Sequence, residues 1–174
     1  MIRTPLLLAA LVVTAPAIAA PPPVTALAYR PDGKLLAAGT RGVVHLIDPG
    51  KGEVVADLPG QAGRVTAAAI SRSGALAVAS GEPAKSGVVR LYDTRDLKQT
   101  KPTAEFTAHK DAIYALAFSP DGKTLATAGY DKLIKLWTVP LSAAPEPRLT
   151  LTDHSDAVYA LDFHPSGKLL ASGS

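Results

Sequence analysis

The chain has 174 residues, no cysteine, 5% aromatic residues and a formal net charge of +3. A chain without cysteine can form no disulfide, no thiolate metal site and no covalent haem attachment. The small positive excess is spread along the sequence, and no run of Lys or Arg is interleaved with aromatic residues. A nucleic-acid-binding groove is therefore not expected.

Residues 1–19 have the pattern of a secretory signal peptide. Arg3 precedes an apolar run from Leu6 to Val13, and small residues follow at Ala17 and Ala19. This order is typical of an export signal, and the apolar run is shorter than the roughly 20 residues of a membrane-spanning helix. We expect cleavage after Ala19 and an exported mature chain, periplasmic or extracellular, with no membrane span. The alternative is an uncleaved N-terminal anchor.

An apolar strand, a glycine turn and a second strand then recur four times. The first strands are predicted at 24–29, 65–70, 113–118 and 158–163, so their starts lie 41, 48 and 45 positions apart. Asp caps a tight turn and Gly accepts its left-handed conformation, so each copy is expected to form a hairpin. The turn residues are Asp32, Gly33, Gly74, Asp121, Gly122 and Gly167.

Three of the copies continue into further strands. Third strands are predicted at 43–48, 88–93 and 133–138, and fourth strands at 53–58, 103–107 and 148–151. A four-stranded antiparallel unit with this period is expected of propeller blades. We predict an all-β fold in which residues 20–174 form a partial β-propeller of about three and a half blades, at about 22–60, 61–107, 108–152 and 153–174.

The first strand of each copy is rich in alanine. A propeller's first strand lies beside a narrow central channel, where wedge-shaped blades converge and large side chains would clash. Neighbouring blades also cover both faces of a strand, which favours continuous apolar runs over alternation. The small residues expected at this inner position are Ala26, Ala28, Ala67, Ala68, Ala69, Ala115, Ala117 and Ala160.

The third copy, residues 109–137, resembles the WD-repeat family of β-propellers. In that family His, Ser or Thr, Asp and Trp form a hydrogen-bonded structural network within each blade. The resemblance assigns this network to His109, Thr127, Asp131 and Trp137, and part of it to His154 and Ser172 in the fourth copy. Other copies depart from the pattern, with Gln61 at the His position, Ile47 and Tyr92 at the Trp position, and Arg41 and Ser86 at the Asp position.

The set of Thr127, His109 and Asp131 is interpreted as structural rather than as a nucleophile triad. Its members are expected on different elements of one blade, where buried polar groups need partners. The four histidines form no H-x-H or H-E-x-x-H pair, and no glycine-rich phosphate loop is present. We predict no catalytic residue, no metal site and no cofactor.

Three loops longer than the repeat requires are expected at 82–86, 94–102 and 139–147. In the propeller that the resemblance implies, the first opens on one rim and the other two on the opposite rim. Loops carry binding function more often than the strands that support them. The hypothesis is that Glu82, Lys85, Arg95, Asp96 and Lys98 contribute to a partner-binding rim, and the alternative is that these are tolerated surface loops.

The resemblance implies a non-enzymatic scaffold that binds proteins. The alternative is a propeller module of a larger exported enzyme or redox protein whose catalytic domain lies elsewhere. The sequence stops within the second strand of the fourth copy, and a propeller must close to protect its edges. We expect an open arc that is aggregation-prone at its terminal blade, whose partner is another protein or the remainder of the same propeller.

Overall fold

The computed structural model of the chain describes residues 22–140 and 145–174, and within these ranges every regular element is a β-strand. The all-β prediction is confirmed. No helix occurs among these residues, and so none that is long and apolar enough to cross a membrane. The predicted signal peptide and its cleavage site after Ala19 lie outside the described residues.

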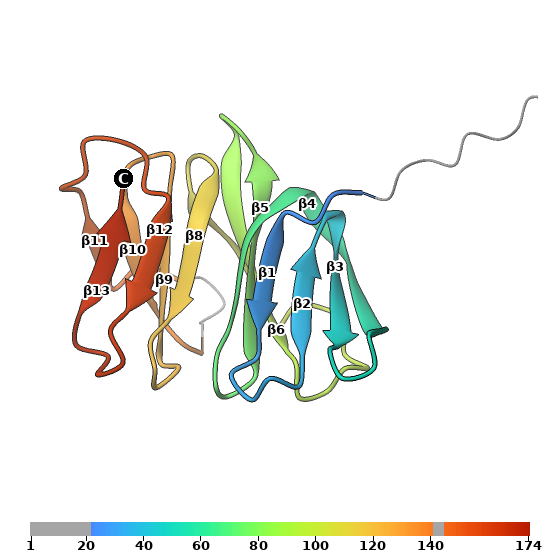
Figure 1. Cartoon of the computed structure of the whole chain (residues 1–174). Helices are drawn as coiled ribbons and strands as arrows, with labels where there is room; N and C mark the ends of the chain where they lie inside the picture. Colours follow the sequence, from blue (N-terminus) through green and yellow to red (C-terminus); the bar gives the residue numbers. More distant parts are fainter. Residues whose placement is uncertain (1–21, 141–144) are drawn as a thin grey trace, which may run out of the picture.

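The strands form three antiparallel sheets (Figure 1). The first contains seven strands in the order β1 to β7, the second has the order β11-β10-β9-β8, and the third pairs β12 with β13. The bounds are β1 Ala26–Tyr29, β2 Leu36–Gly39, β3 Arg41–Asp48, β4 Glu53–Ile70, β5 Ala75–Glu82, β6 Ser86–Asp93, β7 Ala104–His109, β8 Ile113–Phe118, β9 Thr124–Gly129, β10 Ile134–Thr138, β11 Leu149–Leu151, β12 Ala160–Phe163 and β13 Leu170–Gly173.

The seven-stranded sheet arises because β4 is a single strand of 18 residues. Its first part pairs with β3, from Val43 opposite Pro59 to Asp48 opposite Glu53, and its last part pairs with β5. Gly60 lies between these parts and Gly63 begins the second, and their φ values of +80° and +71° favour glycine and redirect the strand. The end of the first copy and the start of the second therefore share one strand, which runs through residue 60.

The four glycine turns have the same geometry. Gly33, Gly74, Gly122 and Gly167 have φ between 70° and 88°, and each backbone N–H donates to the carbonyl three residues earlier. In two of the turns an aspartate carboxylate also accepts a backbone hydrogen bond, from Lys34 N to Asp32 and from Lys123 N to Asp121, both at 3.0 Å. These turns connect the inner strand of each copy to its second strand.

The core consists of three apolar layers, one between each pair of successive copies. In the first layer Leu46 and Leu58 pack with Leu76, and in the second Leu91 packs with Leu125 and Trp137. The third layer joins Ala126, Ile134 and Leu136 to Val158. Each copy thus buries one face against the next, and the copies stack along a curved arc.

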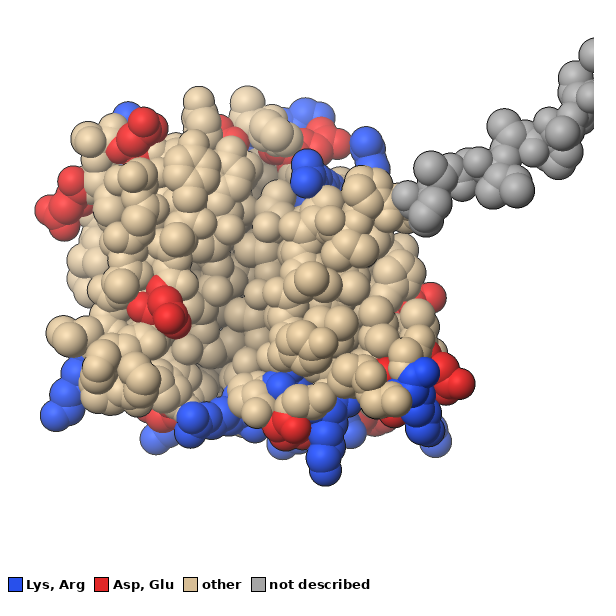
Figure 2. Space-filling model, viewed as in Figure 1, with Lys and Arg blue, Asp and Glu red and all other residues tan. Residues whose placement is uncertain are grey.

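The inner strands β1, β4, β8 and β12 lie side by side across the copies (Figure 1). They line an open groove of about 290 Å³, whose walls include the predicted alanines Ala26, Ala67, Ala68, Ala115 and Ala160. Figure 2, viewed from the same side, shows Lys, Arg, Asp and Glu gathered mainly along the upper and lower rims, with a mostly uncharged, hollowed middle. Small side chains allow the strands to converge along this groove.

Candidate functional site

The structure brings His109, Thr127, Asp131 and Trp137 together inside the third copy. His109 Nε2 lies 2.7 Å from Thr127 Oγ1, and His109 Nδ1 lies 2.8 Å from Asp131 Oδ1. Trp137 Nε1 donates to Thr127 Oγ1 at 3.0 Å. All of these atoms are satisfied when the Thr127 hydroxyl donates to Nε2 of a neutral imidazole whose Nδ1–H donates to Asp131. Thr127 is 0% exposed, so its hydroxyl is out of reach of a substrate.

Asp131 is the ionised end of this network. Burial raises the pKa of Asp131, but the hydrogen bond from His109 and the backbone N–H groups of Leu133 and Lys110 outweigh it and hold that pKa below its ordinary value. The carboxylate is half-buried and its oxygens are occupied by partners within the blade. The arrangement fixes side chains and leaves no acid or base facing a cavity.

The second copy replaces this network with a shorter one. Gln61 Nε2 donates to Tyr92 OH at 2.8 Å and to the Leu58 carbonyl at 3.2 Å. Both side chains are buried, and Val78 takes the strand position that Thr127 holds in the third copy. The fourth copy resembles the third, because His154 Nε2 lies 2.8 Å from Ser172 Oγ.

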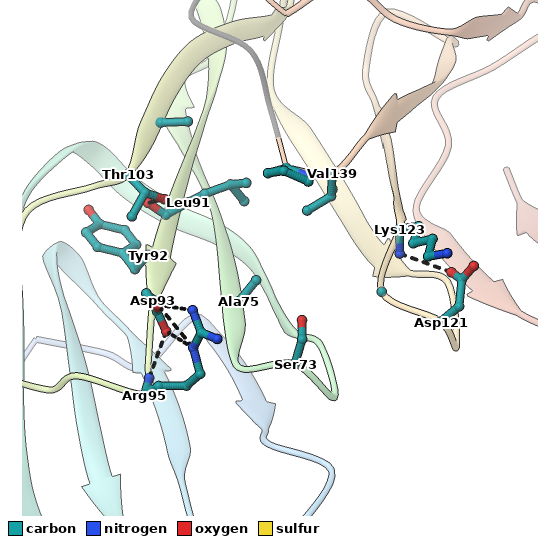
Figure 3. Close-up of a pocket in the computed structure, with 13 residues that line it drawn as sticks. Ser73, Ala75, Leu91, Tyr92, Asp93, Arg95, Thr103, Asp121, Lys123 and Val139 are labelled. Carbon is teal, nitrogen blue, oxygen red and sulfur yellow. Dashed lines mark hydrogen bonds and ion pairs between the residues drawn. The ribbon is translucent and has the colours of Figure 1, made fainter.

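A cleft of about 470 Å³ opens between the second and third copies at one rim (Figure 3). One wall comes from the turn before β5, from the end of β6 and from the start of β7. The other comes from the β8–β9 turn and from the residues that follow β10. The lining residues are Ser73, Ala75, Leu91, Tyr92, Asp93, Arg95, Thr103, Ala104, Asp121, Gly122, Lys123, Val139 and Pro140.

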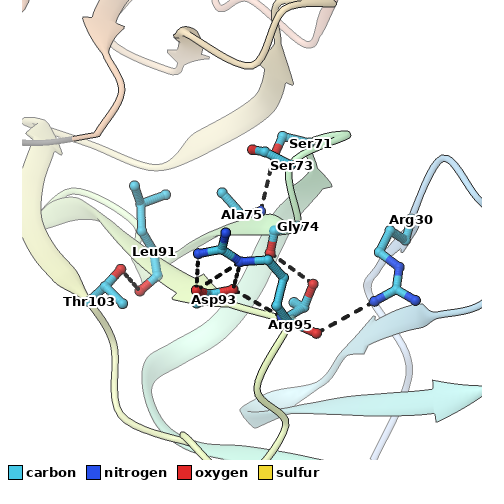
Figure 4. Close-up of polar contacts among 10 residues, drawn as sticks. Arg30, Ser71, Ser73, Gly74, Ala75, Leu91, Asp93, Arg95 and Thr103 are labelled. Atoms are coloured by element: carbon cyan, nitrogen blue, oxygen red, sulfur yellow. Dashed lines mark hydrogen bonds and ion pairs between the residues drawn. The ribbon is translucent and has the colours of Figure 1, made fainter.

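Backbone contacts hold the Arg95 side of the cleft in place (Figure 4). The Thr94 hydroxyl donates to the Gly74 carbonyl at 2.8 Å, which ties the end of β6 to the neighbouring turn. Arg95 Nε donates to Asp93 Oδ1 at 2.8 Å, and this pairing together with the Arg95 backbone N–H lowers the pKa of Asp93 to about 2. Asp93 therefore stays ionised, and it forms an ion pair with Arg95.

The opposite wall presents a cation and an apolar surface. The Asp121 carboxylate accepts from the Ser119 hydroxyl at 2.6 Å and from the Lys123 backbone, which lowers the pKa of Asp121. Within the described residues Lys123 Nζ makes no hydrogen bond or ion pair, and Leu91 and Val139 supply an apolar floor. Such a surface can hold a carboxylate beside an apolar side chain, and it contains no activated nucleophile.

The residues of the predicted partner rim lie at both ends of β6. Glu82 and Lys85 form an ion pair at the β5–β6 hairpin, while Arg95 and the adjoining Asp96 and Lys98 follow the other end of that strand. Only Arg95 enters the cleft. The sequence analysis predicted a lengthened loop at 139–147 but did not name Lys123, because Lys123 belongs to a turn repeated in other copies and only the packing of two copies brings it opposite Arg95.

Potential metal ligands do not converge anywhere in residues 22–140 and 145–174, where no group of three or more His, Asp or Glu could hold an ion. The charged residues of the cleft are Asp93, Arg95, Asp121 and Lys123, and its two acids already have hydrogen-bond partners within the chain. The site as described is suited to binding.

Several known proteins are similar to this chain. The anaphase-promoting complex subunit cdh1 of Dictyostelium discoideum is 32% identical over 112 residues, which are 64% of this chain and 14% of that protein. An uncharacterized WD repeat-containing protein of Synechocystis is 32% identical over 117 residues, 66% of this chain and 31% of that protein. The chain thus spans less than a third of the length of either relative.

A solved structure shares the fold. A chain in the crystal structure of the mitotic checkpoint complex matches with a TM-score of 0.76 at 27% identity, over 86% of this chain and 44% of that chain. The predicted partial β-propeller is thereby confirmed. A family model described as "WD domain, G-beta repeat" matches residues 18–48, 100–138 and 145–174, more than half of the sequence. On this evidence the chain belongs to the WD40 repeat family.

Proposed function

We propose that this chain is a non-catalytic scaffold that binds another protein in the cleft between its second and third blades. WD-repeat proteins are generally protein-interaction scaffolds and typically not enzymes. The observation that carries the proposal is the cleft itself, which joins an apolar floor to two cationic side chains, Arg95 and Lys123. A rigid rim of this kind is where a propeller can present binding residues on loops.

The charges of the cleft indicate an acidic partner segment. Asp93 is paired with Arg95, and Asp121 accepts from Ser119 and from its own turn, so both carboxylates already have partners. Arg95 is mostly exposed and has guanidinium N–H groups beyond those on Asp93, and Lys123 reaches the same opening. A partner carboxylate would meet these two cations while an apolar neighbour packs on Leu91 and Val139.

A selection from a random peptide library displayed on phage tests this proposal. The wild-type chain is expected to enrich peptides that combine Asp or Glu with an apolar residue. The double variant Arg95→Glu, Lys123→Glu should lose that enrichment. The matched control is Lys34→Glu, Lys168→Glu, because these lysines occupy the same turn position in the first and fourth copies. An enrichment that is absent in the wild type, or equal in the cleft variant, would refute the proposal.

We propose further that the scaffold acts outside the cytoplasm. The support is the sequence pattern alone, an arginine, an apolar run and small residues before the first strand. A fusion of the full chain to alkaline phosphatase, which is active only after export, should be active in a bacterial expression host. The variant Leu7→Arg, Leu8→Arg should abolish that activity, and N-terminal sequencing should place the mature start at Ala20. Equal activity of the two fusions would exclude export by this segment.

A further inference from the structure

Three tyrosines from the third and fourth copies meet beside the groove between the inner strands. The rings of Tyr114 and Tyr159 are stacked, with centroids 5.0 Å apart and planes inclined by 16°. Tyr130 lies edge-on to Tyr114, with centroids 6.5 Å apart and planes inclined by 81°. We name these three residues the tyrosine cluster. Tyr114 and Tyr159 also line the groove.

The cluster comes from a motif found only in the last two copies. Residues 111–116 read DAIYAL and residues 156–161 read DAVYAL, whereas the first two copies have Thr25 and Thr66 at the tyrosine position. Thr25 and Thr66 turn their hydroxyls back onto backbone carbonyls. Tyr114 lies at a register shift of the β8–β9 ladder, as Thr66 does in the β4–β5 ladder, and such bulges re-aim side chains. The larger tyrosine side chain therefore extends beyond the strands where the threonine does not.

Much of the cluster faces solvent. Tyr130 is 55% exposed and Tyr159 is 59% exposed. Burial raises the pKa of Tyr114, as do its neighbours Tyr159 and Asp111, so its phenol is neutral at physiological pH. Neutral, electron-rich ring faces attract a cation placed over them.

Aspartates precede the two stacked tyrosines, and the charge of Asp111, whose Oδ1 accepts from the backbone of Ala84 and Ala112, is felt at Tyr114. Asp111 and Asp156 stand three residues before the two stacked tyrosines. Lys132, which follows shortly after Tyr130, is held by the Ser155 carbonyl at 2.7 Å. In Figure 2 the Lys and Arg side chains lie along the rims, and the middle of the face that carries the inner strands has none in view.

We propose that the tyrosine cluster is a second binding site, which receives an arginine side chain of a partner protein. The planar guanidinium stacks on the exposed ring faces of Tyr130 and Tyr159 while Asp111 and Asp156 add electrostatic attraction. Arginine is preferred to lysine here because a flat, weakly hydrated cation stacks better on aromatic rings. This site is independent of the cleft, which is predicted to bind acidic segments.

Nuclear magnetic resonance of the full chain tests the site, with N-acetyl-arginine amide as the probe and its neutral citrulline counterpart as the comparison. The arginine probe is expected to shift the aromatic signals of Tyr114, Tyr130 and Tyr159, and citrulline is not. Tyr159→Leu should weaken binding by about fivefold or more, whereas Tyr159→Phe, which keeps the ring, should stay within about twofold.

Two control variants make the result decisive. Tyr29→Leu changes a tyrosine that is 60% exposed on β1 and belongs to a different blade, and it should leave binding unchanged. The double variant Arg95→Glu, Lys123→Glu should also bind the arginine probe normally, so failure of the cleft and failure of this site are separable. Equal shifts with citrulline, or no shift in the cluster, would overturn the proposal. Dimerisation of the chain that Tyr159→Leu abolishes would also overturn it, by assigning the patch to a second copy.

Discussion

The second and third blades use different hydrogen-bond networks for the polar side chains buried within them. In both, the buried polar side chains at the His and Trp positions are hydrogen-bonded, while Ser80 Oγ on β5 of the second blade is buried without a partner among the described residues. The third blade uses four residues, with Thr127 linking His109 to Trp137 and Asp131 at the far end. The second joins Gln61 directly to Tyr92, and Gln61 also donates to the Leu58 carbonyl.

The difference shows that different residues can satisfy the polar groups at the His and Trp positions of a blade. In the second blade an apolar Val78 occupies the threonine position, and it needs no partner since Gln61 already reaches the tyrosine. In the third blade the shorter network would fail, because Trp137 and His109 each present a nitrogen that only Thr127 satisfies. A buried polar atom without a partner is costly, so these residue choices depend on one another.

The largest effect is expected from removing the indole of the third blade. Trp137 is buried, and its ring lies 4.6 Å from that of Phe106 at 60°. Trp137→Ala should lower the free energy of unfolding by about 3–5 kcal/mol, measured by urea denaturation followed by circular dichroism. Tyr29→Ala, on an exposed ring, should stay within about 0.5 kcal/mol. A loss at Trp137 no larger than the control would show that this layer does not support the blade.

A direct test of the comparison exchanges the linking residue. Thr127→Val gives the third blade the residue of the second and leaves the Trp137 and His109 nitrogens unpaired, which should cost about 2–4 kcal/mol. Thr127→Ser keeps the hydroxyl, as Ser172 does in the fourth copy, and should retain most of the stability. Equal losses for valine and serine in urea denaturation would mean that the hydroxyl is not what matters.

The two blades should also differ in their response to acid. The pKa of folded Asp131 lies below its ordinary value of 3.8, so the ionised carboxylate stabilises the fold at pH above 3.8. That stabilisation is lost as the pH falls through the folded-state pKa, because both states are then protonated. The midpoint of thermal unfolding of the wild type should therefore decrease as the pH drops below about 4. The midpoint of Asp131→Asn should change less steeply with pH.

The acid test has a matched control in the second blade. The network of Gln61 and Tyr92 has no group that titrates in the acid range. Gln61→Glu adds a carboxyl group to it and should make the midpoint of thermal unfolding depend more steeply on pH. An unchanged slope in Asp131→Asn would mean that other carboxylates account for the acid sensitivity. The measurement is the midpoint of thermal unfolding, followed by the fluorescence of Trp137.

The smallest effect is expected at the tyrosine of the second blade. Tyr92→Phe removes the hydroxyl but keeps the ring, and Gln61 Nε2 retains its bond to the Leu58 carbonyl. The expected loss is about 1 kcal/mol, below that of Thr127→Val, in the same urea experiment. A loss equal to that of Thr127→Val would mean that the two networks contribute equally to stability.

Much of the fold could be predicted from local signals. The predicted bounds of β8, residues 113–118, agree with the structure at every residue, since an apolar run beside a glycine turn specifies a hairpin without reference to the rest of the chain. The long β4 could not be foreseen, because in a sequence the glycines at 60 and 63 indicate a turn that ends one strand and begins another.

The sequence by itself determined the period, the antiparallel hairpins, the glycine turns and the alanines of the inner strands, because each depends on neighbouring residues. Only the tertiary structure decided that Gln61 bonds to Tyr92, that Lys123 faces the Arg95 side of a cleft, and that Tyr114 stacks on Tyr159. These pairs are separated by many residues and belong to different strands or blades. Their contacts depend on how the sheets stack, and no local sequence pattern specifies that stacking.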